Sequence, residues 1–340
     1  MSNWPGNLIR KTPVTPAGPF QNGAASGVWS LAEAAYWTKQ GLWPIPGNVA
    51  PIGLFGGGYI TTNVIDKISI ASAANATDFG DLNFARLYLA SCSSSTRGLF
   101  GGGVDGGFSP VSNVSYVTIA TDGNSTNFGD LLNLDQEPCA CSSATRGLFA
   151  GGNTSGGYFS AIATIQYFTI ATTGNATSFG NLTAARYALA ACSSTTRGLF
   201  GGGINGAGAN VSVINFVTIA TTGNATSFGN LTASTSSLAG CSSSTRGLFA
   251  GGSAGSNTNT IEYVTIASAG NATDFGDLTV ARAYLAGCAS STRGVFGGGS
   301  GSLNVIDFVT IASLGNATVF GDLTVGRYGL AACSNTHGGL

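Results

Sequence analysis

The phrase TRGLFGGG, at residues 96–103, recurs almost unchanged along this 340-residue chain, and its recurrence constrains the fold more than any other feature. Successive copies of its phenylalanine lie 45 to 51 residues apart. A second phrase, FGDL or FGNL, and a cysteine recur with the same period. A repeat of this length indicates a tandem array of small structural units that pack on one another. The three markers are Phe55, Phe100, Phe149, Phe200, Phe249 and Phe296; Phe79, Phe128, Phe179, Phe228, Phe275 and Phe320; and Cys92, Cys141, Cys192, Cys241, Cys288 and Cys333.

One unit, residues 182–229, shows the pattern that each repeat follows. A run of small and apolar residues (AARYALAACSS) precedes a turn and the short segment GLFGGG. After a loop come the β-branched segment VINFVTIATT, a Gly-Asn turn and a short last segment. This pattern lacks helical periodicity and predicts short strands joined by hairpins. Four antiparallel strands per unit are typical of a β-propeller blade, so we expect an all-β, six-bladed propeller over residues 53–340.

The two ends of the repeat region predict how the ring closes. The first unit begins at Gly53 with its second strand and has no first strand of its own. The last unit supplies a surplus first strand at Tyr328–Ser334. We expect this C-terminal strand to complete blade 1 beside Leu54 and Phe55, because closure removes the exposed sheet edges that promote aggregation.

Each second strand ends in a glycine triplet, of which only the first position is replaced, by Ala150 and Ala250. Glycine tolerates positive φ and close backbone approach, at a cost of about 0.5–1 kcal/mol in chain entropy. Two strict glycines in every unit therefore indicate a structural need where the second strand ends against the next blade. We assign this role to Gly57, Gly102, Gly151, Gly202, Gly251 and Gly298.

An arginine in the turn before the second strand also follows the period. A ring of such cations on one face would bind sulfate, phosphate or the carboxylate of a glycan. Alternatively, each arginine clamps the nearby FGDL or FGNL loop through its Asp or Asn and through backbone carbonyls. The regular spacing favours this second, structural interpretation. The five residues are Arg97, Arg146, Arg197, Arg246 and Arg293.

The order of these motifs resembles the kelch repeat, which carries an arginine, a hydrophobic first strand, a second strand ending in a double glycine, a variable loop and a tyrosine-bearing third strand. LTVARAYLAGC, VFGGG and NVIDFVTIA occupy these places in order, and the resemblance covers about residues 53–340. Phenylalanine stands where kelch repeats have tryptophan, which marks a divergent, kelch-like branch. The arginine before the first strand is absent from two units, near Glu137 and Ser234, and is present at Arg86, Arg186, Arg282 and Arg327.

Catalytic and cofactor chemistry is not expected of this chain. Its single histidine, His337, replaces the repeat arginine, and no zinc-protease, CxxC, nucleophile-elbow or P-loop motif is present. The copper oxidases among kelch-like propellers need converging His and Tyr ligands, which one histidine cannot provide. The FGD carboxylates repeat in register, whereas catalytic residues normally break a repeat's symmetry. We expect no enzymatic activity, no metal and no other cofactor.

Composition narrows the partners and the compartment. Charged residues make up 8% of the chain and the net charge is −1, so no global field attracts nucleic acid. No apolar run approaches the ~20 residues of a membrane span, and the first residues lack a signal peptide's apolar core. We expect folding in a cytoplasm, without secretion or membrane insertion. The repeat cysteines and the extra Cys139 are then reduced and buried.

A glycosylation sequon, NAT or NST, recurs in every unit. Asn before a strand is ordinary turn chemistry, because Asn tolerates the left-handed region, and we interpret the motif in this way. The asparagines are Asn75, Asn124, Asn175, Asn224, Asn271 and Asn316.

The loops that follow the glycine triplets vary in length and composition. In repeat folds such insertions gather on one face, which is often the binding face. Aromatic, Asn and Asp residues on glycine-rich loops suit a polar ligand such as a saccharide, although unselected loops would look similar. The candidate binding residues are Tyr59, Asp105, Phe108, Tyr158, Phe159, Asn205, Asn210 and Asn257.

Residues 1–52 do not repeat and form a predicted N-terminal arm. Ser30 and Glu33 have the spacing of a capping box, so we expect a short helix at about 29–40. All four tryptophans of the chain lie in this arm, which makes it a candidate docking element or a segment that packs on the propeller. They are Trp4, Trp29, Trp37 and Trp43.

The arm, with SGVWSL and GLWP around the predicted helix, resembles virion proteins of tailed bacteriophages, particularly those of marine cyanobacteria. This resemblance implies a non-enzymatic structural protein of a tail, fibre or capsid appendage that assembles in the host cytoplasm. The arm would bind other virion proteins, and the propeller loops would bind a host-surface glycan or protein or a neighbouring subunit. The alternative is a free lectin or protein-interaction scaffold that uses the same loops.

Overall fold

The computed structural model describes residues 33, 36, 50–59, 62–154 and 160–340. The chain divides into two units, Met1–Pro51 and Ile52–Leu340. The four tryptophans lie outside the described residues. So does the helix expected at about 29–40, except for Glu33 and Tyr36, which both have helical backbone.

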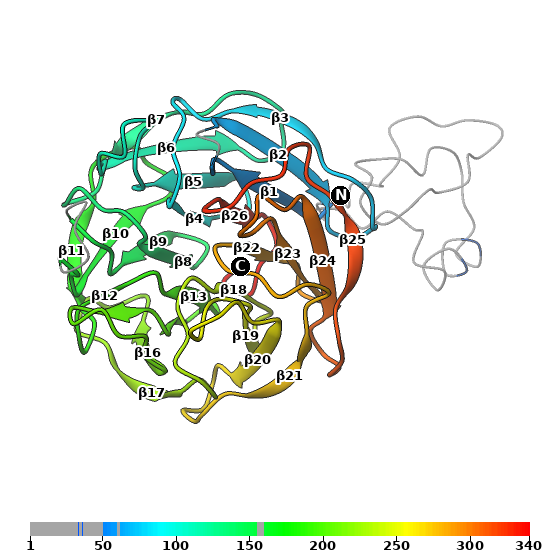
Figure 1. The fold of residues 1–340 in the computed structure, drawn as a ribbon. Helices are drawn as coiled ribbons and strands as arrows, with labels where there is room; N and C mark the ends of the chain where they lie inside the picture. Colours follow the sequence, from blue (N-terminus) through cyan, green and yellow to red (C-terminus); the bar gives the residue numbers. More distant parts are fainter. Residues whose placement is uncertain (1–32, 34–35, 37–49, 60–61, 155–159) are drawn as a thin grey trace. The chain divides into compact units, whose positions relative to one another are not determined.

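The described residues of 52–340 include six four-stranded antiparallel sheets. The sheets are arranged around a common centre, as Figure 1 shows. The inner strands are β26 (Ala331–Ser334), β4 (Ala90–Ser93), β8 (Cys139–Ser142), β13 (Ala190–Ser193), β18 (Ala239–Ser242) and β22 (Ala286–Ala289). The second strands are β1 (Ile52–Gly56), β5 (Arg97–Gly101), β9 (Arg146–Ala150), β14 (Arg197–Gly201), β19 (Arg246–Ala250) and β23 (Arg293–Gly297).

The third and outer strands complete each blade. The third strands are β2 (Val64–Ser69), β6 (Asn113–Thr118), β10 (Thr164–Thr169), β16 (Val213–Thr218), β20 (Thr260–Thr265) and β24 (Val305–Thr310). The outer strands are β3 (Thr77–Asp81), β7 (Thr126–Asp130), β11 (Thr177–Asn181), β17 (Thr226–Asn230), β21 (Thr273–Asp277) and β25 (Thr318–Asp322). Two short strands, β12 (Arg186–Tyr187) and β15 (Ile204–Asn205), form a separate two-stranded sheet.

The C-terminal strand closes the ring, as the sequence predicts. Blade 1 has the strand order β26-β1-β2-β3, and blades 2 to 6 follow in chain order. Strand β26 pairs with β1 in the antiparallel register that places Leu54 opposite Cys333 and Phe55 opposite Ala332. The all-β, six-bladed prediction with four antiparallel strands per blade is therefore confirmed.

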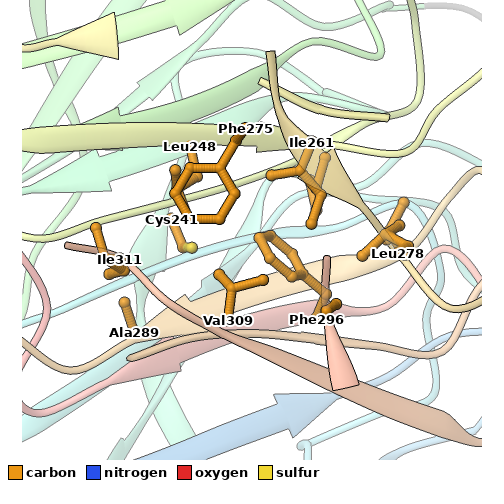
Figure 2. Close-up of a cluster of buried hydrophobic side chains, with 13 residues drawn as sticks. Cys241, Leu248, Ile261, Phe275, Leu278, Ala289, Phe296, Val309 and Ile311 are labelled. Atoms are coloured by element: carbon orange, nitrogen blue, oxygen red, sulfur yellow. The ribbon is translucent and has the colours of Figure 1, made fainter. Parts of the chain in front are cut away.

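The hydrophobic core lies between neighbouring blades. Figure 2 shows the cluster between blades 5 and 6, where Leu248 and Phe275 of blade 5 meet Phe296 and Val309 of blade 6. All four side chains are at most 3% exposed. Each third strand buries side chains on both of its faces, because a blade is covered by a neighbour on either side.

The repeat cysteine packs on a glycine of the next blade. The glycine is the one after the arginine of the repeated phrase, and a methyl group in its place would lie 2.5 to 2.9 Å from the thiol sulfur. This explains why cysteine and glycine recur together. All seven cysteines are free and buried. The pairs are Cys92–Gly147, Cys141–Gly198, Cys192–Gly247, Cys241–Gly294, Cys288–Gly53 and Cys333–Gly98.

The second glycine of each triplet adopts a left-handed backbone. Its φ lies between +62° and +70° in all six blades. A side chain there would also collide with a carbonyl oxygen of the next blade, that of the residue at the Arg86 position. Both constraints exclude residues other than glycine. The first position of the triplet lies in the strand, where Ala150 and Ala250 are accommodated.

We predict that Gly147→Ala destabilises the propeller by about 1–3 kcal/mol, because the added methyl group would lie 2.5 Å from the Cys92 sulfur. Cys92→Ala alone costs about 1 kcal/mol through the cavity it leaves. The double variant should lose less stability than the sum of the two, by about 0.5–3 kcal/mol, because each change relieves the other. The free energy of unfolding, measured with denaturant, checks this.

Gly270→Ala is the matched control, because a methyl group at Gly270 meets nothing within 4 Å. We expect it to change stability by less than about 0.5 kcal/mol. Additive effects of Gly147→Ala and Cys92→Ala would contradict the direct contact.

Candidate functional site

The variable loops and the segments that lead into the inner strands share one face of the propeller, which we call the loop face. Each loop pairs with the lead-in segment of its own blade just after the glycine triplet. In blade 2, Leu87 and Val104 exchange backbone hydrogen bonds of 2.9 and 3.1 Å. In blade 4 the same pairing is the two-stranded sheet of β12 and β15. The loops therefore surround the ends of the inner strands.

Two of the predicted binding residues shape their own loops. Oδ1 of Asp105 accepts hydrogen bonds from the backbone N–H groups of Gly107 and Ser109, at 2.9 and 3.0 Å. Asn205 makes the same two contacts in the loop of blade 4. These side chains stabilise the turns, which is the ordinary role of Asp and Asn in loops.

Two other predicted residues tie neighbouring loops together. Nδ2 of Asn210 donates to the carbonyl of Ser253 at 2.8 Å, and Nδ2 of Asn257 donates to the hydroxyl of Ser300 at 2.8 Å. Phe108 is 58% exposed, at the tip of its loop.

Tyr59 packs against Tyr328, with ring centroids 5.0 Å apart and the ring planes tilted by 31°. Tyr158 and Phe159 lie outside the described residues. The structure thus places the described candidates on the loop face without bringing them together into one site.

At the centre of the loop face, one residue from each blade contributes to a closed ring of backbone hydrogen bonds, which we call the mouth ring. Each N–H donates to the carbonyl of the preceding blade at 2.7 to 3.0 Å, and every member has φ between +54° and +65°. Left-handed backbone is costly for residues other than glycine and often marks functional sites. In ring order the members are Tyr88, Glu137, Ala188, Ser237, Tyr284 and Gly329.

The side chains of the mouth ring break the six-fold repeat that its backbone obeys. They line a hollow of about 120 Å³ on the propeller axis. Gly329 lies between Tyr88 and Tyr284 in the ring, and a Cβ on it would lie 2.9 Å from the Tyr88 ring. Because Gly329 has no side chain, the rings of Tyr88 and Tyr284 can approach to 5.3 Å between centroids. Tyr328 adds a third ring, 6.1 Å from Tyr284 and 6.4 Å from Tyr88.

Glu137 is the acidic member of the mouth ring. Its Oε2 atom is buried and accepts no hydrogen bond from any residue that the structure describes. Burial raises the pKa of this carboxyl group to about 7, since a buried carboxylate loses its hydration. The sequence held a signal for this site: six equivalent positions carry Tyr, Glu, Ala, Ser, Tyr and Gly, whereas structural positions repeat. Our sequence prediction used the variable loops after the glycine triplets to choose binding residues, and it therefore missed the six positions of the mouth ring.

The opposite end of the axis is closed by a second ring and by the C-terminal tail. Serine hydroxyls at the ends of the inner strands donate to carbonyls of the preceding blade, as Ser142 does to Ser93 at 2.7 Å. The ring continues through Ser93, Ser193, Ser242 and Ser334, and Ala289 takes the sixth place.

His337 lies against this serine ring. Its Nε2 atom is 3.1 Å from the Ser93 carbonyl and 3.2 Å from the Ser142 hydroxyl, and its Nδ1 atom accepts a hydrogen bond from Gly339 N–H. These contacts need a neutral ring, and burial lowers the pKa of His337 to about 4. His337 therefore has a structural environment at the end of the axis away from the loop face.

The five repeat arginines join adjacent blades. Nη1 of Arg97 donates to the carbonyls of Ile170 and Ala171 at 3.1 and 2.8 Å, and its guanidinium lies over the Tyr116 ring at 4.7 Å. The other four repeat this stack on an aromatic ring of the third strand. Their acceptors are backbone carbonyls, as we expected, but these carbonyls follow the next blade's third strand instead of lying in the FGDL or FGNL loop, whose Asp or Asn we also expected to bind.

The interface between blades 1 and 2 uses a different pair. Ile52 stands at the arginine position of blade 1, and Lys67 stands at the aromatic position. Lys67 forms a salt bridge with Asp122 in the next blade instead. Ile52, Lys67 and Asp122 thus depart from the repeat together, and the salt bridge between Lys67 and Asp122 replaces the arginine contact at this interface.

The sequon asparagines bind the neighbouring blade. Oδ1 of Asn175 accepts a hydrogen bond from the backbone N–H of Asp130 at 3.1 Å. The turn thus holds the end of the preceding blade's outer strand, which is more than the local turn chemistry we expected. The same contact recurs at Asn75, Asn124, Asn224, Asn271 and Asn316.

The arginines before the inner strands are buried and hold the third strands. Arg282 and Arg327 form buried ion pairs of 3.0 Å with Asp307 and Asp66. Arg86 donates a hydrogen bond to Ser115, and Arg186 donates one to Asn215. Ser115 and Asn215 stand at the positions in their third strands that Asp307 and Asp66 occupy in theirs. The two places without arginine hold Asp135 and Thr235, rather than Glu137 and Ser234.

Asp135 accepts a hydrogen bond from Gln166 at 3.0 Å. In blade 5, Thr235 stands at the arginine position and Glu262 at the position of its partner, and both are buried. Arginine and its partner are therefore replaced together in these two blades.

Comparison with protein-family models finds no family that matches the chain, and comparison with curated proteins finds no matching relative. Within the described ranges, no group of three or more His, Cys, Asp or Glu side chains is arranged to hold a metal ion. The described helical residues include no helix long and apolar enough to cross a membrane.

We predict that acidification destabilises the propeller through His337. Its pKa is lower in the folded state, so the stabilisation from its neutral form is present above about pH 6.5 and is lost as the pH falls towards 4. The thermal midpoint of the wild type should therefore fall more between pH 7 and 4.5 than that of His337→Gln. Parallel pH profiles of the two proteins would contradict this, since all other titrating groups are shared.

Proposed function

We propose that this protein is a non-enzymatic structural component of a virion whose propeller binds a host-surface ligand through its loop face. The observation that carries the binding part is the mouth ring: a fixed backbone frame whose side chains break the repeat and gather tyrosines around a hollow. Residues that differ from blade to blade, and that do not pack the blades against each other, are the residues we assign to ligand binding. A saccharide suits the site, because aromatic rings stack on sugar faces and the surrounding loops offer polar groups.

The virion part of the proposal rests on the sequence of the arm. Residues 1–52 contain all four tryptophans and resemble virion proteins of tailed bacteriophages, and the chain has few charged residues. In this proposal the arm anchors the protein to other virion proteins as part of a tail, fibre or capsid appendage. We also propose that the blades are a divergent form of the kelch repeat, supported by the arginine, double glycine and strand order they share with it.

A free lectin is the second candidate, and the same mouth ring favours it. The two candidates differ in what the arm does and in whether the protein is part of a particle. They share a ligand on the loop face and the absence of catalysis.

We expect the full chain to bind a subset of glycans on an array, and Tyr88→Ala with Tyr284→Ala to abolish that binding while the propeller stays folded. The tyrosines supply the stacking surface, and they are half-buried side chains outside the blade cores. Val319→Ala is the control, since Val319 is 61% exposed on the outer strand β25, away from the mouth ring. Binding that survives loss of both tyrosines would contradict the site, and a chain that binds neither glycans nor host cells would contradict the function.

Deletion of residues 1–51, which leaves Ile52 and the whole of β1 in place, should give a folded propeller that no longer joins its particle. Circular dichroism and thermal unfolding report the fold, and incorporation into assembled particles reports the anchor. Normal incorporation of the truncated protein would contradict the anchoring role of the arm.

A further inference from the structure

One oxygen of the Glu137 carboxyl group is the feature of the mouth ring that hydrogen bonding among the described residues does not explain. This Oε2 atom is buried without a donor from the described residues. Leaving a buried hydrogen-bonding atom without a partner costs about 1–3 kcal/mol. Buried polar atoms without partners are few in native proteins, and each calls for an explanation. A donor that arrives with a ligand is one.

The surroundings of Glu137 favour a cation. None of the described residues that line the hollow is lysine, arginine or histidine. Glu137 and Tyr88 are neighbours in the mouth ring, joined by the hydrogen bond from Glu137 N–H to the Tyr88 carbonyl at 2.9 Å. The Tyr88 ring lies 5.3 Å from the Tyr284 ring and 6.4 Å from the Tyr328 ring, between centroids. Clustered aromatic rings beside a carboxylate attract an organic cation through their negative faces.

The other half of the ring leaves room for such a ligand. Ala188 and Ser237 occupy the positions that follow Glu137, so small side chains lie opposite Gly329 and Tyr88 in the six-membered ring. The hollow of about 120 Å³ is several times the about 10–15 Å³ that a single water needs on the same measure. This volume suits an ammonium group with a few carbon atoms, while the rest of a larger ligand would lie among the loops.

We propose that the mouth ring binds a terminal primary ammonium group, whose N–H donates to Oε2 of Glu137 while its charge faces the rings of Tyr88 and Tyr284. Because Oε2 of Glu137 needs a hydrogen-bond donor, the site should prefer a primary ammonium group, which has N–H bonds, to a quaternary ammonium group, which has none. An anion finds no positive partner there. This inference rests on the proposed function, because it assumes that the loop face is the binding face. It adds the chemical group of the ligand that binds there. A lysine side chain and an amino sugar both present this group.

The test is calorimetric titration of the full chain with n-butylammonium, and with n-pentanol as a neutral analogue of similar size. We expect n-butylammonium to bind at least tenfold more tightly than n-pentanol and more tightly than tetramethylammonium. Glu137→Gln should weaken n-butylammonium binding at least tenfold, which corresponds to about 1.4 kcal/mol. Tyr284→Leu should weaken it severalfold and tests the site independently if Glu137→Gln does not fold.

Asp274→Asn is the matched control, because Asp274 is an exposed carboxylate on β21. Strand β21 is the outer strand of its blade, at the opposite edge of the sheet from the inner strand β18. It should leave binding unchanged. Equal binding of n-butylammonium and n-pentanol, tighter binding of tetramethylammonium, or an unaffected Glu137→Gln variant would each overturn the proposal.

Two further probes distinguish the sources of the ammonium group. An Nα-acetyl-lysine amide that binds more tightly than glucosamine would identify a protein ligand, and the reverse order would identify an amino sugar. Glucose and N-acetylglucosamine, which lack the ammonium group, should bind more weakly than glucosamine. If glycans without amines bind on the array and need Tyr88 and Tyr284, the proposed function stands and the ammonium assignment fails.

Discussion

Adjacent blades approach each other through glycine, and the rest of the propeller depends on that close contact. The thiol of one blade occupies the space that a Cβ of the next blade would fill, as between Cys92 and Gly147, and this recurs at all six interfaces. Protein interiors are packed as densely as organic crystals, so such a contact has no spare volume. In a closed ring, a displacement at one interface must be compensated at the others. This constraint gives every unit the same glycine and the same cysteine.

The close packing of the blades also fixes the two ends of the axis. Serine hydroxyls link the inner strands at one end, and left-handed backbone links them at the other through the mouth ring. Backbone contacts of this kind do not depend on side-chain identity. Selection can therefore vary the side chains of the mouth ring, from Tyr88 to Gly329, while the frame that holds them stays constant. A repeat fold gains one asymmetric site in this way without losing its symmetric packing.

Where the arginine of an interaction is lost, the residue at its partner's position changes too. Blade 1 replaces the stacked arginine and aromatic ring by Ile52 and Lys67, and Asp122 of blade 2 supplies the charge that Lys67 pairs with. Blade 3 replaces the buried arginine by Asp135, and Gln166 donates to it. A buried charge left without its partner is strongly destabilising, so these positions vary in pairs. Such pairs stabilise the fold, whereas Oε2 of Glu137 has no donor among the described residues and belongs to the candidate site.

The sequence by itself determined the period, the four strands of each blade, the number of blades and the strand that closes the ring. These follow from patterns within one unit: β-branched runs, turns and the glycines after each second strand. Only the tertiary structure decided the partners. Arg97 binds carbonyls of the next blade, Asn175 holds the end of the preceding one, and Tyr88 meets Tyr284 across a glycine of the blade between them. The physical reason is that these contacts join equivalent places of different units. The pattern of a single unit records which residues recur, but not which recurring residues face each other when the ring closes.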